Sequence, residues 1–224
     1  MTLAAVKQAL RKEAAHAVQG LSRSALEEQS AAVCTAVQAL PQFRAARTIS
    51  IYLSMPSGEL DTWALCRATL DDKALYVPRF STLAAGSNAN VKHKFTTDME
   101  MLRVHDAHEL AHGLTQNKWG IAEPPPTRDG QDREAALADA SLDVIIVPGM
   151  LFDRRGGRLG HGKGYYDRYL QKAAAHATAR GRPVPYIVAV ALREQVRDAP
   201  VPMDDTDVSI DALITADETR IFSP

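Results

Sequence analysis

The residues best suited to chemistry in this sequence are glycines and basic side chains that lie together between positions 148 and 168. Six of the chain's 13 glycines fall here, and the stretch also holds Arg154, Arg155, Arg158, Lys163 and Arg168 against only two acidic residues, Asp153 and Asp167. Because glycine costs backbone entropy, such a density indicates close approach of the backbone to a ligand or several positive φ angles. Phosphate fits both features, since backbone amides and cationic heads can together surround its oxygens.

Two standard phosphate motifs almost match this loop and fail. Gly157 to Gly164 has the glycine and lysine spacing of a P-loop, but Gly164 stands where that motif has the hydroxyl that binds magnesium. The dinucleotide fingerprint fails because the glycines follow the spacing Gly160-x-Gly162-x-Gly164. A metal that accompanies the phosphate would need a carboxylate from elsewhere, and Asp167 is the nearest. The alternative is a solvated basic loop without a ligand.

A buried strand before the loop and a helix after it are expected to position these residues. Residues 142–147 are almost all apolar, which is typical of a strand covered on both faces of a parallel sheet. A helix is expected over residues 165–179. In open α/β sheets, ligands bind where such a strand ends and the next helix begins.

The rest of the chain alternates helical and strand patterns, which predicts an α/β fold with a layered, mostly parallel sheet flanked by helices. Further helices are expected over residues 3–19, 24–40, 61–70 and 132–140, and further strands over residues 48–53, 74–77, 91–96, 187–191 and 212–215. Ser24 and Glu27 have the spacing of a capping box for the second helix. Pro78 is expected to end the strand over residues 74–77, and residues 98–128 are expected to form loops. On the first helix, Lys7 and Arg11 lie one turn apart on the wet face.

Length, charge and cysteine content exclude several classes of protein. With 224 residues the chain fits one domain over positions 1–224, and a net charge of −1 offers no field to attract nucleic acid or an anionic membrane. No apolar run approaches the roughly 20 residues of a membrane span, and the first residues lack a signal-peptide pattern. Cys34 and Cys66 read as ordinary thiols. A cytoplasmic location is therefore expected.

Motifs in order along nearly the whole chain resemble the 5-formyltetrahydrofolate cyclo-ligase family. They are Lys7-x-x-x-Arg11, Ile49–Leu53 followed by Glu59–Thr62, Trp119 to Pro124, the strand from Leu142 to Pro148, Pro148-Gly-x-x-Phe-Asp153, and the run from Gly157 to Asp167. The late motif differs, because the family often reads Pro-x-Glu-x-His-Asp where this chain has Asp204 in place of Glu and Thr206 in place of His. The resemblance implies a fold like that of the NagB/RpiA/CoA transferase group. It also implies a ligase that uses ATP and Mg²⁺ to cyclise 5-formyltetrahydrofolate to 5,10-methenyltetrahydrofolate through phosphorylation of the formyl oxygen. A monomer is expected.

The resemblance also assigns roles to individual residues. ATP would be bound by Lys7, Arg11, Arg158, Leu159, Gly160, His161, Gly162, Lys163, Gly164, Tyr165 and Tyr166, with Arg158 and Lys163 as the catalytic residues. The folate would contact Leu53, Glu59, Trp119, His161, Gly162, Lys163, Gly164 and Tyr165. Magnesium would be held by Asp167 and Asp207. Because Tyr165 and Tyr166 follow adjacent directions on a helix, at most one of them is expected to face the ligand.

Two other classes of function stay open. A phosphate-binding or RNA-binding module would use the basic loop without turning over ATP, and its binding would weaken with salt. The near-neutral charge and the lack of a stripe of aromatic and basic residues argue against it, so no nucleic-acid partner is expected. A sugar-phosphate isomerase on a related sheet would need a positioned general base in place of magnesium.

Overall fold

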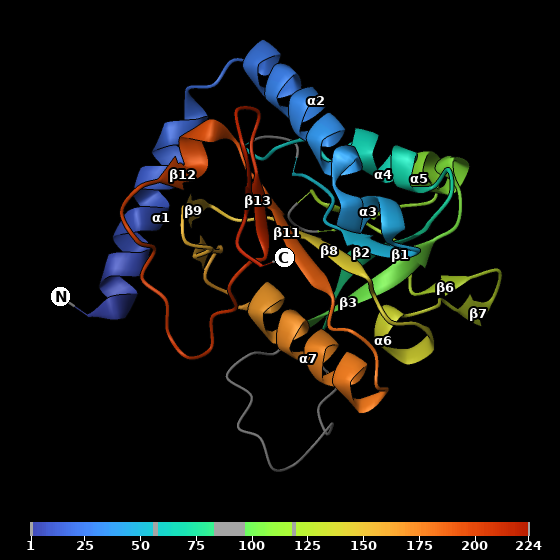
Figure 1. Ribbon diagram of the computed structural model, residues 1–224. Coiled ribbons are helices and arrows are strands. Elements are labelled where there is room, and N and C mark those ends of the chain that lie inside the picture. The colour runs from blue at the N-terminus through green and yellow to red at the C-terminus, as the bar shows by residue number, and fades with distance from the viewer. Residues whose placement is uncertain (1, 56–57, 83–96, 118–119, 224) are drawn as a thin grey trace.

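The centre of the protein is a seven-stranded sheet with helices on both faces (Figure 1). The computed structural model describes residues 2–55, 58–82, 97–117 and 120–223. In spatial order the sheet contains β14 (Thr219–Ile221), β13 (Ala212–Ile214), β11 (Tyr186–Val190), β8 (Val144–Val147), β1 (Thr48–Ile51), β2 (Ala74–Thr82) and β3 (Thr97–Val104). The five inner strands are parallel, and β14 and β3 are antiparallel at the edges. The prediction of a layered, mostly parallel α/β sheet is confirmed.

Alternate residues of the central strand β8 supply two cores. Val144 and Ile146 pack on the face covered by α2 (Arg23–Ala39), α3 (Pro41–Ala45) and α4 (Trp63–Thr69). Ile145 and Val147 pack on the other face, under α7 (Tyr165–Ala179). Because successive strand residues point to opposite faces, a strand buried on both sides must be apolar throughout, as the sequence of β8 is.

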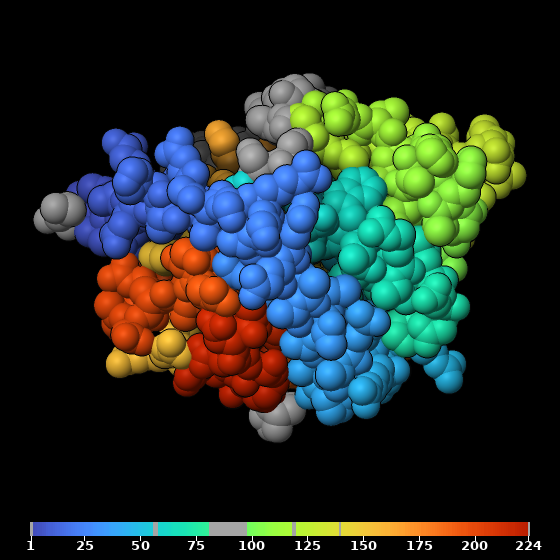
Figure 2. Space-filling model, turned by 90° about the horizontal axis from the view of Figure 1, so that it is seen from above, coloured from blue at the N-terminus to red at the C-terminus, as the bar shows by residue number. Residues whose placement is uncertain are grey.

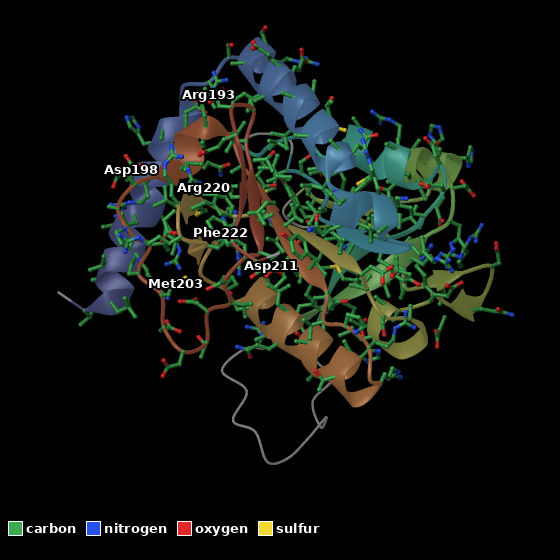
Figure 3. All side chains as sticks on the ribbon, in the orientation of Figure 1. Arg193, Asp198, Met203, Asp211, Arg220 and Phe222 are labelled. Carbon is green, nitrogen blue, oxygen red and sulfur yellow. The ribbon has the colours of Figure 1, made fainter. Side chains whose placement is uncertain are left out.

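The remaining elements lie outside the main sheet. They are α1 (Leu3–Gln19), α5 (Ala107–His112), α6 (Ala136–Asp139), a 3₁₀ turn η1 (Arg193–Gln195), a three-stranded sheet of β10 (Arg158–Leu159), β9 (Leu151–Asp153) and β12 (Val196–Arg197), and the ribbons of β4 (Thr115–Gln116) with β5 (Ala122–Glu123) and β6 (Thr127–Arg128) with β7 (Gln131–Asp132). Helix α1 lies beside η1 and the chain that follows it (Figure 2). Further along, Met203 packs on an apolar cluster that includes Ala14 of α1 (Figure 3). This packing holds α1 at one end of the sheet.

Several expected elements differ from those observed. The strand expected to end at Pro78 continues to Thr82, where it still pairs with β3. Proline is tolerated inside it because β1 pairs with β2 only as far as Tyr76, so the N–H that Pro78 lacks would have had no partner on β1. The antiparallel partner β3 occupies residues expected to form loops. Helix α2 is capped by Ser22, whose hydroxyl accepts from the amide of Ala25 at 3.1 Å, so the predicted capping box is wrong.

Two further differences concern the middle and the end of the chain. The helix expected over residues 132–140 is reduced to α6, with β7 before it, and the edge strand β14 has no counterpart among the predictions. The strand expected over residues 91–96 lies outside the described residues. Cys34 and Cys66 are free thiols, as predicted. Within the described ranges, no helix combines the length and the apolar character that a membrane span requires.

Candidate active site

A cavity of 940 Å³ opens where β1 and β8 end, between α1, the chain that follows β10, and the first turn of α7. Its wall contains nearly all the residues to which the resemblance gives a role: Lys7, Arg11, Leu53, Glu59, Arg158, Leu159, Gly160, His161, Gly162, Lys163, Gly164, Tyr165, Tyr166, Asp167 and Asp207. Trp119 lies outside the described residues. The sequence therefore predicts the wall of one cavity from motifs that are up to 200 positions apart.

Part of the predicted glycine-rich loop is a β-hairpin, and the buried carboxylate of Asp153 closes its turn. One oxygen of Asp153 accepts from the amides of Arg155 at 2.7 Å and Gly157 at 2.9 Å, and the other accepts from Val201 at 2.7 Å. Asp153 thus ties the hairpin that carries Arg158 to the chain that leads to Asp207. In the sequence, Asp153 has a place in the family motif but no predicted structural role, although an aspartate before a glycine-rich turn is a known turn former.

Gly157→Ala tests this junction, because an added Cβ at Gly157 would overlap the Asp153 carboxylate. Three amides hold that carboxylate in place, so it has little room to retreat. We expect the substitution to lower the free energy of unfolding by about 2 kcal/mol or more in urea denaturation. Gly20→Ala is the matched control, since a Cβ at Gly20 meets nothing within 4 Å and the backbone there is right-handed. A loss of equal size at Gly20, or none at Gly157, would refute the role of Asp153.

Arg158 is a buried cation whose partner is a predicted metal ligand. Its side chain is 2% exposed, and its Nη2 atom lies 2.5 Å from the Asp167 carboxylate. The guanidinium also lies over the ring of Tyr166, with 5.9 Å between its central carbon and the ring centroid. Asp167 accepts a second bond, from the amide of Val208 at 3.2 Å, which brings the neighbouring Asp207 to the same part of the cavity.

Lys7 and Arg11 face the cavity and not open solvent, so the prediction of a wet helix face is wrong. Lys7 is 8% exposed, and its ammonium lies 2.7 Å from Asp204 and also contacts Asp207. Arg11 donates through Nε to the carbonyl of Gly160 at 2.8 Å. Burial alone would lower the pKa of Lys7, but the bonds to the two carboxylates outweigh it and raise that pKa above its ordinary value. The ammonium therefore stays charged.

The turn from Gly160 to Gly164 is the open part of the loop. His161 and Lys163 are exposed, and the ammonium of Lys163 has no hydrogen-bond or ion-pair partner in the part of the chain that the structure describes. Gly164 has φ +64°, a left-handed conformation that favours glycine, and it begins α7 without a side-chain cap. Amides at the start of a helix that lack such a cap are suited to an anion.

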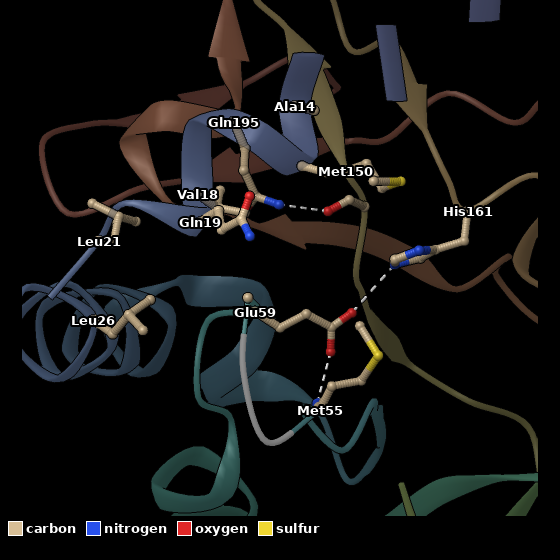
Figure 4. Close-up of a pocket in the computed structure, with 13 residues that line it drawn as sticks. Ala14, Val18, Gln19, Leu21, Leu26, Met55, Glu59, Met150, His161 and Gln195 are labelled. Carbon is tan, nitrogen blue, oxygen red and sulfur yellow. Dashed lines mark hydrogen bonds and ion pairs between the residues drawn. The ribbon is translucent and has the colours of Figure 1, made fainter. Parts of the chain in front are cut away.

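Glu59 lies at the boundary between the main cavity and a smaller pocket of 330 Å³ that α1 and Leu26 help to line (Figure 4). One of its oxygens accepts from the amide of Met55 at 2.8 Å, and the other lies 3.5 Å from Nε2 of His161. The Glu59 side chain is 10% exposed. It is therefore a largely desolvated carboxylate that a ligand with N–H groups can reach from the cavity.

Tyr165 and Tyr166 both line the cavity, and Tyr166 also packs against both hydrophobic cores. That at most one of them faces the ligand stays a prediction. The Tyr165 ring packs on Phe80, with 4.8 Å between centroids, and the guanidinium of Arg168 lies 5.3 Å from it. Burial raises the pKa of Tyr166 well above its ordinary value, and the Glu59 carboxylate adds to this effect. The phenol of Tyr166 therefore stays protonated at neutral pH.

The residues present fit a magnesium ion that shares its ligands with phosphate. Among the described residues, no three or more His, Cys, Asp or Glu side chains converge on one point, so a metal cage made only of protein is absent there. Magnesium is commonly bound by one or two carboxylates together with substrate phosphates. Asp167 and Asp207 each bond through one carboxylate oxygen, and the second oxygen of each has no hydrogen-bond partner in the described chain.

The layered sheet and the cationic cavity at the ends of its parallel strands define an α/β enzyme. The sequence model of the 5-formyltetrahydrofolate cyclo-ligase family matches residues 3–216. The chain is 34% identical over 196 residues to the probable 5-formyltetrahydrofolate cyclo-ligase of Schizosaccharomyces pombe, covering 86% of each chain, and 31% identical over 218 residues to the mouse enzyme, covering 97% of each. The NMR structure of Aquifex aeolicus 5,10-methenyltetrahydrofolate synthetase matches with a TM-score of 0.69 at 28% identity, over 97% of this chain and 93% of that one. The chain belongs to the 5-formyltetrahydrofolate cyclo-ligase family, which is a family of ligases.

Proposed function

We propose that the protein cyclises 5-formyltetrahydrofolate to 5,10-methenyltetrahydrofolate in a reaction that consumes ATP and requires Mg²⁺. The observation that carries the proposal is the cavity itself. Its wall contains the desolvated carboxylate of Glu59 and the cationic side chains of Lys7, Arg11, Arg158, Lys163 and Arg168. The cations suit a triphosphate, and the carboxylate suits the amine and ring N–H groups of a pterin. One cavity of this size can hold both reactants side by side.

The chemistry needs activation of a poor leaving group. A formamide oxygen does not leave easily, and transfer of the γ-phosphoryl group to it solves this problem. The formyl oxygen forms a bond to phosphorus while the bond from phosphorus to ADP breaks. The neighbouring amine outside the ring then attacks the formyl carbon and loses its proton, and the C–O bond breaks to release phosphate. The protein contributes mainly positioning and neutralisation of charge.

The cations divide this work according to their burial. Arg158 is fixed by its pair with Asp167, so it provides a preorganised positive charge beside the transferred group. Lys163 is exposed on the open turn, and it closes on the phosphates when they bind. The uncapped start of α7 supplies amides to the same anion.

Magnesium, when bound, neutralises charge on the phosphate oxygens. Asp167 and Asp207 are the residues that would hold it, through the carboxylate oxygens that have no partner in the described chain. At the other end of the cavity, Glu59 orients the pterin and Leu53 supplies an apolar contact. His161, which lies against Glu59, gives up that contact to the incoming ring.

The test is a turnover assay on the purified protein. 5-Formyltetrahydrofolate is mixed with the protein with and without ATP, and with and without Mg²⁺, and the near-ultraviolet absorbance of the methenyl product is followed. We expect a signal only when ATP and Mg²⁺ are both present, and its loss on addition of a chelator. Absence of any ATP-dependent signal would refute the proposal, and salt-sensitive RNA binding without turnover would favour the binding-module alternative.

A further inference from the structure

Lys7 contacts two carboxylates, and only one of them has a role in the proposed function. Its ammonium lies 2.7 Å from Asp204 and also contacts Asp207, which the proposal gives to the metal. Lys7 contacts the Asp207 oxygen that also accepts from the amide of Asp204, and the metal would bind the other oxygen, so the two cations draw on the single negative charge of one carboxylate. Binding of the metal at Asp207 therefore weakens the contact between Asp207 and Lys7 and shifts the ammonium toward its second partner.

The chain around Asp204 is built to provide that second partner. The Asp204 oxygen that does not touch Lys7 accepts from the amide of Thr206 at 3.0 Å and from its hydroxyl at 2.6 Å. The amide of Asp204 donates to Asp207 at 2.8 Å, so both carboxylates belong to one turn. From α7, Gln171 donates to the carbonyl of Thr206 at 3.0 Å and anchors this turn.

We propose that Asp204 is a positioning residue for Lys7, which retains the ammonium at the cavity when the metal takes Asp207 and so keeps it available to the phosphates. The inference rests on the proposed function. It also gives a role to the place where the late motif departs from the family pattern, since Thr206 holds Asp204 in position. Bonds from Lys7 and Thr206 keep the pKa of Asp204 well below its usual range, so the carboxylate stays charged.

This arrangement predicts that substitutions of Lys7 and Asp204 have opposite effects on the affinity for a metal ion that binds without nucleotide. In Lys7→Met, Asp207 loses the competing ammonium, and Mn²⁺ alone should bind about tenfold tighter. In Asp204→Asn, Lys7 has only Asp207 as partner, and Mn²⁺ alone should bind about three- to fivefold weaker. General damage to the site would weaken metal binding in both variants.

The experiment measures Mn²⁺ dissociation constants by electron paramagnetic resonance, first without nucleotide and then with the β,γ-methylene analogue of ATP. The decisive comparison is a double-mutant cycle, in which Asp204→Asn is made both alone and together with Lys7→Met. If Asp204 acts through Lys7, then in the Lys7→Met background Asp204→Asn should change the Mn²⁺ dissociation constant no more than Asp205→Asn does. Asp205 is the matched control, because it is exposed and has no hydrogen bond or ion pair within the described chain.

Each outcome decides the proposal. If Asp204→Asn weakens Mn²⁺ binding equally with and without Lys7, Asp204 is a direct metal ligand and the positioning role is overturned. If Asp204→Asn has no effect in either background, the positioning role is overturned as well. Thr206→Val keeps every charge, so it should weaken Mn²⁺ binding in the same direction as Asp204→Asn even if Lys7→Met does not fold, and no change would overturn the proposal. Failure of the wild-type protein to bind Mn²⁺ even with the nucleotide analogue would refute the proposed function itself, and the exchange of partners with it.

Discussion

Lys163→Ala is expected to lower kcat/KM for the cyclisation by about 10²- to 10³-fold, the usual effect of removing one group that stabilises charge in a transition state. Lys163 stands on the open turn of the cavity, and its ammonium has no partner among the described residues. It is therefore free to contact the transferred phosphoryl group. For the same reason the fold does not depend on it, and the free energy of unfolding should change by less than about 0.5 kcal/mol.

The measurement compares steady-state kinetics and urea denaturation for Lys163→Ala and for Lys12→Ala. Lys12 is an exposed lysine of α1 that lies outside the cavity wall, so the control removes the same charge without touching the site. Unchanged turnover in Lys163→Ala would refute its role in charge neutralisation. A similar loss in Lys12→Ala would attribute the effect to the net charge of the protein.

Arg158→Met is expected to damage both activity and stability. Turnover should fall by more than about 10³-fold, as it does when an arginine that stabilises a transferring phosphoryl group is removed. The substitution also leaves Asp167 without its cation in a largely desolvated place, since the two side chains are 2% and 16% exposed. Breaking such a pair should cost about 3 kcal/mol of unfolding free energy.

The double variant Arg158→Met with Asp167→Asn separates these two effects. It removes the unpaired carboxylate, so urea denaturation should show that part of the stability returns. Activity should not return, because neither the cation nor the proposed metal ligand is present. If the double variant is as unstable as Arg158→Met alone, the stabilising role assigned to this ion pair is wrong.

The part of the cavity wall from Arg158 to Asp167 could be predicted from the residues themselves because its signal is local. Its glycines and basic side chains lie together in a composition that suits an anion, and the buried strand β8 before it reads as apolar throughout. The more distant parts of the wall, Lys7, Arg11 and Asp207, came only from the family resemblance. Which face of the first helix packs against the rest of the protein could not be predicted in the same way. Helical periodicity relates Lys7 to Arg11, but it does not say what will pack against them.

Pairings between distant parts of the chain were also beyond the sequence. Lys7 and Asp204 are 197 positions apart, and no local signal connects them. The edge strand β3 was missed for a different reason. Met99 and Met101 are buried and alternate with Asp98 and Glu100, but Leu102 breaks the alternation. Methionine also has no strong preference for strands, so the pattern did not stand out.

The most direct test of the account is a crystal structure of the protein with Mg²⁺ and the β,γ-methylene analogue of ATP. The account predicts that the phosphates lie within hydrogen-bond distance of backbone amides between Gly160 and Gly164 and that Lys163 turns toward them. A nucleotide bound elsewhere, with those amides facing solvent, would contradict it.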